Sequence, residues 1–376
     1  MQLEIRIWRE FNLFLLGCVV VLLIISGLCV YSATFNAVTA YGTPLNILFP
    51  RHIVNILLGL GMLFAFASFD YRLISGLALP FYLVVIGVLA VVLIAGKVSE
   101  GAQSWIEVGT RTFQPSEVAK LIIIVALATY FARFEDQLEA WNVQFGGLLI
   151  IGIPLLLILI QPDFGTALVV GTIWLTMAWC AGIRWQQLLL LAVVATPIIF
   201  IGWEKILDNE QKSRLLTFYW MFVNPSQVDP NEGYNITQSL NAIGSGGLFG
   251  AGLRHGILSQ GNYIPVQYSD FIFAVVGEEM GFVGGLVLLT FEGLLLWLIL
   301  SIAHRARDTF GRLVAIGIFG MFLAHLVVNV GMAMSILPVT GLPLPFISYG
   351  GSFTITALTA IGLLESITMR WRKIVF

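Results

Sequence analysis

Long apolar segments recur along the whole chain, separated by polar stretches. Ten of these segments are long enough to cross about 30 Å of hydrocarbon as a tilted helix, which takes about 20 residues. The pattern therefore predicts an all-α polytopic membrane protein with ten transmembrane helices, forming a single integral-membrane domain over residues 1–376. The predicted segments are 11–32, 51–68, 74–96, 117–133, 145–161, 165–181, 186–203, 270–302, 310–336 and 352–368.

Two of these segments are short and flank the sequence QPDFGT at residues 161–166. A helix, a break and a second helix in this order predict either a tight hairpin or a re-entrant feature. The pattern leaves both alternatives open.

Basic residues in the short loops predict the orientation. They concentrate in the loops that lie inside if the N-terminus is inside, so both termini are expected in the cytoplasm. The longest connection, residues 204–269, is then a large extracytoplasmic loop between the seventh and eighth helices. Asp270 lies at the outer surface, where this loop enters the eighth helix. The inner basic residues are Arg6, Arg9, Arg72, Arg133, Arg184, Arg305, Arg307, Arg312, Arg370, Arg372 and Lys373.

Composition agrees with a membrane protein, since 58% of the residues are hydrophobic and only 11% are charged. The net charge of −2 argues against a nucleic-acid partner. No Walker-type loop, no GxGxxG after a strand and no long cytosolic segment occurs, so we expect no nucleotide cofactor. The three cysteines match no disulfide or metal spacing.

A first polar cluster lies in the sequence GAQSWIEVGTRTFQPSEVAK, residues 101–120. Glu117 and Lys120 are three residues apart on one face of the fourth predicted helix. They form either a local ion pair that anchors the helix or a polar wall facing a cavity, because a membrane span normally avoids both charges. Upstream, Arg111 suits an interfacial phosphate and Trp105 suits the face of a sugar.

Three further polar sites belong to the outer side. Asp163 either caps the following helix or faces a substrate. Gln238 lies on an interfacial helix predicted over residues 234–243, close to a stretch with seven glycines between Gly233 and Gly256. Such glycines allow a sharp turn or a close approach to a ligand. Ser348 lies in a proline-rich loop that either braces two helices or forms the wall of a site.

The sequence VQYSDFIFAVVGEEMGFVGG, residues 266–285, places three acids at the start of the eighth helix. A carboxylate in hydrocarbon costs about 2–3 kcal/mol even on the lenient insertion scales. Asp270 is either an N-cap or a functional group. Glu278 and Glu279 either accept hydrogen bonds from unwound neighbours or pair with Lys120 or Arg111. We expect these acids to face a polar cavity rather than lipid.

Five stretches occur in order from about residue 100 onwards: FQPSEVAKL, QPDFGTALV, GYNITQSLNAIGSGGLFGAGL, SDFIFAVVGEEMGF and GLPLPFISYGGS. They resemble the motifs of the SEDS proteins, named for shape, elongation, division and sporulation. Residues 1–95 resemble this family mainly in hydropathy. The stretch ILPVTGLPLPF is most like the elongation member, because the division member usually has lysine where Thr340 stands.

The resemblance implies a peptidoglycan glycosyltransferase in the bacterial cytoplasmic membrane. It would polymerise lipid II, the undecaprenyl-pyrophosphate-linked disaccharide peptide, at the outer face. The family's essential aspartate falls on Asp270, its cavity charges on Glu117 and Lys120, and its QPD acid on Asp163. The implied partner is a class B penicillin-binding protein, the transpeptidase that cross-links the new strands.

The residues fit this chemistry. Displacement of a lipid pyrophosphate by a sugar hydroxyl needs a general base, for which we predict Asp270, and positive charge at the leaving group, for which we predict Lys120 and Arg111. A divalent cation, Mg²⁺ or Mn²⁺, bridging a carboxylate and the pyrophosphate is an alternative role for Asp270. The lipid tails are expected to enter from the membrane through a groove between helices.

The sequence leaves three alternatives open, of which the first is a glycosyltransferase of the division type. A lipid II flippase needs polar groups along a path between both faces, and His325, Asn329 and Glu292 are the main residues inside the predicted spans. A scaffold that only positions the transpeptidase would need no grouping of Asp270 with Glu117 and Lys120.

Overall fold

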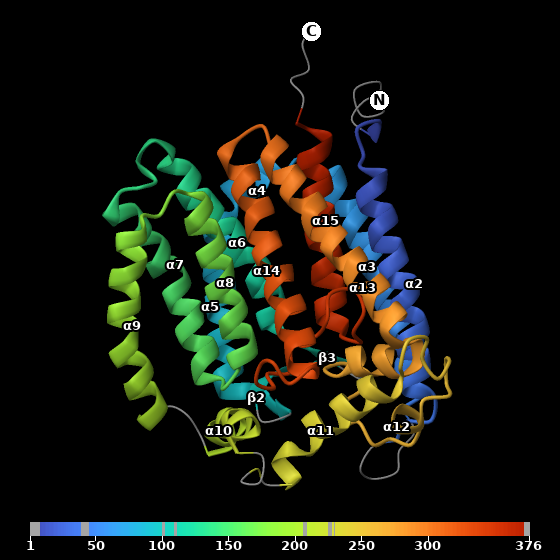
Figure 1. Cartoon of the computed structure of the whole chain (residues 1–376). Helices are drawn as coiled ribbons and strands as arrows, with labels where there is room; N and C mark the ends of the chain where they lie inside the picture. Colours follow the sequence, from blue (N-terminus) through green and yellow to red (C-terminus); the bar gives the residue numbers. More distant parts are fainter. Residues whose placement is uncertain are drawn as a thin grey trace.

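The computed structural model of the chain is a bundle of membrane-length helices (Figure 1). It describes residues 8–38, 45–99, 102–108, 111–205, 209–224, 228 and 230–371. Within these residues, seven helices are long and apolar enough to cross a membrane: α2 (Leu13–Phe35), α3 (Leu48–Ser68), α6 (Pro115–Arg133), α7 (Trp141–Ile160), α13 (Ile272–Arg305), α14 (Thr309–Ala333) and α15 (Gly351–Met369). Shorter apolar stretches lie in α5 (Ala78–Ala95), α8 (Phe164–Cys180) and α9 (Trp185–Lys205).

Each predicted apolar segment coincides with one of these helices. The segment 117–133, for example, is α6, and the segment 310–336 is α14 with the turn that follows it. The prediction of a helical, polytopic membrane protein is therefore confirmed.

The two ends of the bundle differ (Figure 1). One end, the terminal end, carries the N-terminus of α2 and the C-terminus of α15. The short helix α4 (Tyr71–Gly76), which connects α3 to α5, and the turn η1 (Glu135–Gln137), which connects α6 to α7, also lie at this end. The other end, the loop end, carries α10 (Asn209–Val223), α11 (Pro230–Ser245) and α12 (Ile257–Gln260).

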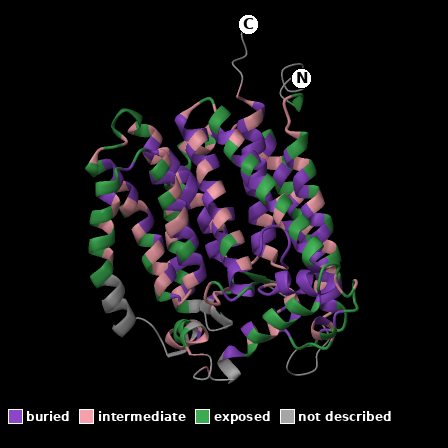
Figure 2. Cartoon of the chain, in the orientation of Figure 1, coloured by how far each residue is buried: buried purple, intermediate pink, exposed green. Residues whose placement is uncertain are grey.

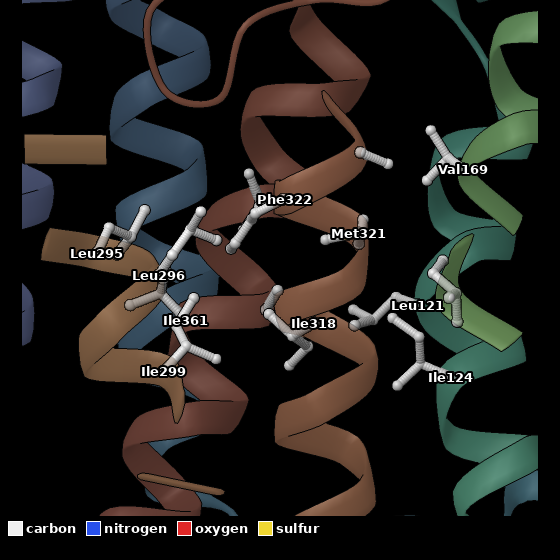
Figure 3. Packing of buried hydrophobic residues seen from close by; sticks show 14 of the residues in the cluster. Leu121, Ile124, Val169, Leu295, Leu296, Ile299, Ile318, Met321, Phe322 and Ile361 are labelled. Carbon is white, nitrogen blue, oxygen red and sulfur yellow. The ribbon is translucent and has the colours of Figure 1, made fainter. Parts of the chain in front are cut away.

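The helix α15 lies at the centre of the bundle. Of its most apolar stretch 89% is buried, against 22% for α3, which packs along it. Figure 3 shows Leu296 and Ile299 of α13 meeting Ile318 and Phe322 of α14, with Ile361 of α15 beside them. The peripheral helices instead present many exposed residues (Figure 2). Large apolar side chains among them suit contact with lipid.

Helices α7 and α8 form a tight hairpin. They run 20 and 17 residues and are joined by residues 161–163. The hydrogen bonds from Gln161 N to Leu157 O and from Asp163 N to Ile158 O end α7. Of the two sequence-based alternatives, the structure shows the hairpin.

A small antiparallel sheet at the loop end was not predicted. Its strands are β1 (Lys97–Ser99), β2 (Ala102–Val108) and β3 (Arg111–Phe113), in the order β1-β2-β3. The sheet is the connection between α5 and α6. By contrast, the interfacial helix predicted over residues 234–243 lies within α11.

The helix α13 is broken near its loop end. Gly281 has φ 68° and ψ −165°, which no helix accommodates, so the ladder is interrupted there. The glycine-rich stretch after α11 supplies the missing partners. Phe282 N donates to Gly247 O and Val283 N to Leu248 O, while Glu278 O accepts from Ala251 N.

These glycines are required because two backbones approach each other directly. A Cβ on Gly250 would lie 2.2 Å from Glu279 O, and one on Gly246 would lie 1.9 Å from Gly277 O. The sequence allowed a sharp turn or a close approach to a ligand. In the structure these glycines allow close approach to the backbone of α13.

Candidate functional site

Lys120 is the centre of a buried polar network at the loop end. The helix α6 begins at Pro115, a favoured first residue because it lacks an N–H group. Its first turns place Glu117 and Lys120 inside the bundle, and the Lys120 side chain has no exposed surface. The Nζ atom lies 2.8 Å from Glu117 Oε2 and 2.9 Å from His325 Nε2. The two charges therefore form an ion pair, but a buried one.

His325 on α14 is held in one tautomer by its two neighbours. A lysine ammonium has no acceptor, so His325 Nε2 accepts from Lys120. The other nitrogen, Nδ1, must then carry the proton and donate to Pro343 O at 3.0 Å. Phe353 stacks on the imidazole, with 4.4 Å between ring centroids, and also lies under the ammonium at 5.4 Å. The cation is thus enclosed by a carboxylate, an imidazole and an aromatic face.

Asp270 lies where the long connection enters α13. Ser269 Oγ donates to its Oδ1 at 2.9 Å. Its Oδ2 faces Gly341, where a Cβ would lie 3.3 Å away. The residue is 8% exposed. The N-cap position of α13 belongs to Phe271, one residue later, and α13 has no side-chain cap there. The N-cap interpretation of Asp270 is therefore wrong.

Residues 334–350, the proline loop, are fixed against this carboxylate by two side chains. Asn329 Nδ2 donates both to Asp270 O at 2.9 Å and to Leu342 O at 2.7 Å. Ser348 Oγ donates to Ser269 O at 2.6 Å and accepts from Leu344 N at 2.8 Å. Ser348 thus braces the loop, and its predicted contact with a substrate stays a prediction.

Asp163 caps α8, as one of its two interpretations requires. Its Oδ1 accepts from Thr166 N at 3.0 Å and its Oδ2 from Thr166 Oγ1 at 2.8 Å. The same Oδ2 accepts from Gln114 Nε2 at 3.1 Å. Because Gln114 is the N-cap residue of α6, Asp163 also joins two helix starts at the loop end.

Glu278 and Glu279 accept hydrogen bonds from neighbouring segments, which is one of the two alternatives that the sequence left open, and both side chains are buried. Glu278 binds the N-terminus of α12, accepting from Leu258 N at 2.7 Å and from Ser259 N at 2.8 Å. Backbone N–H groups at a helix start favour a carboxylate. Glu279 Oε1 accepts from Ser32 Oγ at 2.7 Å and from Gln260 Nε2 at 3.0 Å. Both acids are thus bonded to α12, and Glu279 also to α2.

Three predicted substrate contacts lie further out. Gln238 is half-buried on α11, next to Ser239, whose hydroxyl donates to Ala333 O at 2.8 Å. Trp105 is half-buried on β2 and pairs with Lys97 across the sheet. Arg111 begins β3, but its side chain lies outside the part of the chain that the structure describes.

The sequence analysis considered His325 and Asn329 of α14 only for a transport path and did not assign them to the site. These residues are four apart, one helical turn, and they join Lys120, the proline loop and the peptide of Asp270. The signal was present, since two polar residues at this spacing inside an apolar span indicate function. The sequence did not show which end of the bundle they serve.

The loop end therefore combines a carboxylate held by loop groups with an enclosed cation, both organised by α14. The fold and this arrangement define a polytopic membrane protein in which one end of the bundle carries long connections and a buried polar network. The family model of FtsW, RodA and SpoVE, described as "Cell cycle protein", matches residues 12–373. The chain belongs to this family, the SEDS proteins.

Curated relatives support the same family. The chain is 37% identical to "Peptidoglycan glycosyltransferase MrdB" of Escherichia coli (strain K12) over 346 residues, 92% of each chain. It is 31% identical to "Probable peptidoglycan glycosyltransferase FtsW" of Bacillus subtilis (strain 168), over 97% of this chain and 92% of the relative.

Solved structures show the same fold. One is a chain in "Structural coordination of polymerization and crosslinking by a peptidoglycan synthase complex", with TM-score 0.77 and 30% identity over 95% of this chain and 97% of that one. RodA of Thermus thermophilus, a rod shape determining protein, matches with TM-score 0.68 and 28% identity over 96% and 97%. The chain is thus RodA-like in sequence and in fold.

Proposed function

We propose that this chain, a peptidoglycan glycosyltransferase by its family, polymerises lipid II with Asp270 as the general base. The observation that carries the proposal is the setting of Asp270. Its carboxylate lies at the start of a membrane helix, beside a glycine of the proline loop, while its main-chain oxygen is fixed by Asn329. The side chains of Ser269 and Asn329 and the packing against Gly341 hold this residue in place, rather than a capping role.

The reaction joins two lipid-linked sugars. The 4-hydroxyl oxygen of one N-acetylglucosamine attacks the anomeric carbon of the other substrate's muramyl sugar. The new glycosidic bond forms as the bond from that carbon to the lipid pyrophosphate breaks, with inversion. Asp270 takes the hydroxyl proton, and the pyrophosphate leaves with its electron pair. Because the donor arrives activated, no nucleotide is needed.

The leaving pyrophosphate requires positive charge, for which we propose Lys120 and Arg111. In the described arrangement the Lys120 ammonium is enclosed by Glu117, His325 and Phe353. Contact with substrate therefore requires this enclosure to open, for example by movement of Phe353 at the start of α15. We retain Trp105, Asp163, Gln238 and Ser348 as proposed substrate contacts.

A divalent cation has less support from the described residues. Among them, no group of three His, Cys, Asp or Glu side chains gathers to hold a metal ion. A cation that bridges Asp270 and the pyrophosphate needs fewer protein ligands, so this role of Asp270 stays a prediction and we assign no step to it.

Lipid II transport is supported less well than polymerisation. His325 and Asn329 bond to Lys120 and to the proline loop, so both belong to the loop end. Of the three polar residues considered for a transport path, this leaves only Glu292, which is buried on α13, away from the loop end. A carrier needs polar groups reaching both faces.

We also propose that the bundle crosses the bacterial cytoplasmic membrane ten times, with the loop end outside. The seven long apolar helices and the three shorter ones together give this count. The arginine-rich inner loops predicted from the sequence correspond to the terminal end, where Arg72 and Arg370 lie.

We propose an elongation role and a class B penicillin-binding protein as partner. Identity to MrdB, at 37%, exceeds identity to the Bacillus FtsW, at 31%. A structural relative belongs to a complex described as coordinating polymerisation and crosslinking. Expression in cells depleted of their own elongation or division polymerase should restore rod shape and not septation.

The decisive experiment uses purified protein and labelled lipid II. Asp270→Asn should remain folded and lose polymerisation by about 10²–10⁴-fold, the usual contribution of a general base. Asp270→Glu should retain partial activity at most. Ser269→Ala, which removes only the hydrogen bond to Oδ1, is the matched control and should stay within about tenfold of wild type. Normal polymer from Asp270→Asn would refute the role of Asp270, and translocation without polymer would favour transport.

A further inference from the structure

Residues 246–257, the apolar loop, display large apolar side chains outward at the loop end. Phe249 is 79% exposed and Ile257 is 80% exposed, and Leu248 and Leu253 are also exposed. Exposed apolar residues scattered singly need no explanation, but four within ten residues form a surface. Such a surface indicates that something apolar covers it.

The backbone of the apolar loop is fixed, so these side chains are held outward. Leu248 O accepts from Val283 N at 3.0 Å, and Gly252 N donates to Glu279 O at 3.0 Å. Arg254 N donates to Ser32 Oγ at 3.1 Å, and Glu278 holds the start of α12 at the far end of the loop. A loop bonded to two membrane helices cannot fold its apolar residues away.

The length of α13 gives the depth of this loop. The helix ends in His304 and Arg305, which suit the headgroup layer at the terminal end. About 20 residues at 1.5 Å per residue cover the 30 Å of hydrocarbon. Counting back from Arg305, the other boundary falls at about residue 285. The hydrogen bonds of the apolar loop to Phe282 and Val283 lie within a turn of this level.

The helix α2 gives the same depth independently. It begins at Leu13, and 20 residues further on the boundary falls at about residue 33. Ser32, which accepts from Arg254 N, lies at this level. Two helices that run in opposite directions thus place the apolar loop at one boundary between hydrocarbon and headgroups.

Arg254 has the setting of an interfacial arginine. Its guanidinium carbon lies 3.6 Å from the ring centroid of Phe35 and 5.9 Å from that of Tyr31, both in the last turns of α2. The residue is exposed, so its charge remains available above an aromatic face. Arginines at this depth bury their stem and direct the charge to lipid phosphates.

We propose that the apolar loop is an interfacial anchor, seated in the headgroup layer of the adjoining leaflet. Leu248, Phe249 and Ile257 enter the boundary of the acyl chains, and Arg254 binds a lipid phosphate. The surface is continuous with the lipid side of α13, where Phe282 and Leu286 are 64% and 54% exposed. This continuity favours lipid over a protein partner as its cover.

The anchor has a consequence for the site. The apolar loop carries main-chain bonds to Glu278 and Glu279, and these residues precede the break at Gly281. The first part of α13, which begins two residues after Asp270, is therefore tied to the membrane surface. This inference does not rest on the proposed activity.

Depth can be measured directly in the full-length protein. Nitroxide labels are placed at Phe249→Cys and Ile257→Cys, in a Cys180→Ser background reconstituted in phosphatidylcholine nanodiscs. Leu286→Cys is the lipid reference and Asp136→Cys, exposed on η1, is the water reference. The labels on the apolar loop should collide with oxygen more than with a water-soluble nickel chelate, as at position 286.

Collision rates like those at position 136 would overturn the proposal. Labels that are water-exposed in nanodiscs and become protected only when a partner protein is added would show a protein docking surface instead. A label at Asn241→Cys on α11, outside the apolar loop, shows whether protection from the nickel chelate is confined to this loop.

The role of Arg254 has its own test. Adding phosphatidylglycerol to the nanodiscs should raise the Tm of wild-type protein. Arg254→Lys keeps the charge and should retain most of this gain, whereas Arg254→Gln should lose part of it. The phosphate charge of phosphatidylglycerol, unlike that of phosphatidylcholine, is not balanced by choline, so equal gains in all three proteins would overturn the lipid contact assigned to Arg254.

Discussion

At the residue scale, the burial of Lys120 changes the energetics of its ion pair. An exposed pair of this spacing contributes well under about 1 kcal/mol. Here both partners are buried, and removal of one charge leaves the other buried without compensation. Such a loss costs about 3–5 kcal/mol. A single substitution at Lys120 therefore lowers stability as well as any catalytic contribution, and an activity assay alone does not separate the two effects.

A double substitution separates the two effects. Lys120→Met should lower the free energy of unfolding by several kcal/mol, and adding Glu117→Gln should restore much of it, because no lone charge remains. If Lys120 acts on the pyrophosphate, the restored double variant still polymerises poorly. Thermal unfolding and polymer yield from lipid II measure the two properties. Near-normal polymerisation by the double variant would leave Lys120 a structural residue.

At the element scale, the break in α13 depends on glycines of another segment. Gly250 has φ 79° and meets Glu279 O, so a side chain there is both strained and obstructed. By contrast, a Cβ added at Gly244, near the end of α11, would meet no neighbouring atom within 4 Å. The two glycines belong to one sequence motif but play different physical roles.

We therefore expect Gly250→Ala and Gly244→Ala to differ in sign. Gly250→Ala should destabilise by more than about 2 kcal/mol, from backbone strain and displacement of the loop. Gly244→Ala should be neutral or stabilise by up to about 1 kcal/mol, since alanine favours the helix. Unfolding temperatures in detergent compare them. Equal effects would contradict the loop–helix packing.

Asp308 connects two helices at the terminal end. It caps α14 through Gly311 N at 2.7 Å and accepts from Tyr71 Oη on α4 at 2.5 Å. Burial, reinforced by the hydrogen bond to Asp308, raises the pKa of Tyr71 to about 12, so the phenol remains a donor at neutral pH. One carboxylate thus joins α4 to α14.

Asp308→Ala should remove both bonds and also the partly exposed ion pair with Arg72 Nε at 3.2 Å. It should cost about 1–3 kcal/mol, mainly from the lost cap and the unpaired phenol. Asp308→Asn retains a capping oxygen and should cost less. Chemical unfolding of the two variants in detergent gives the difference. An alanine variant as stable as the asparagine variant would show that the cap is unimportant.

At the scale of the whole molecule, orientation decides whether the loop end meets its substrate. The chain has free cysteines at positions 18, 29 and 180, of which only Cys180 is partly accessible. In a Cys180→Ser background, Asn241→Cys on α11 should react with an impermeant thiol reagent in spheroplasts. Asp136→Cys on η1 should react only after lysis. The reverse pattern would invert the proposed topology and exclude polymerisation at the outer face.

The hydrophobic pattern alone determined the long apolar helices of the bundle. Each apolar segment coincides with one helix, because a segment in hydrocarbon must satisfy its backbone hydrogen bonds internally. The ordered motifs determined the family, and the residue types at Asp270, Glu117 and Lys120 marked the loop end. These features depend on composition and order, which a sequence states directly.

Only the tertiary structure decided which polar groups meet. The sequence left the partners of Glu278 and Glu279 open, and the structure shows that these acids accept hydrogen bonds from α12, which precedes them in the chain. It paired Lys120 with Glu117 but not with His325, 205 positions away. Hydrogen bonding acts over a few ångströms, so the partner of a buried charge depends on how the helices pack. Spacing along one helix cannot reveal this, and packing places His325 and Asn329 at the site.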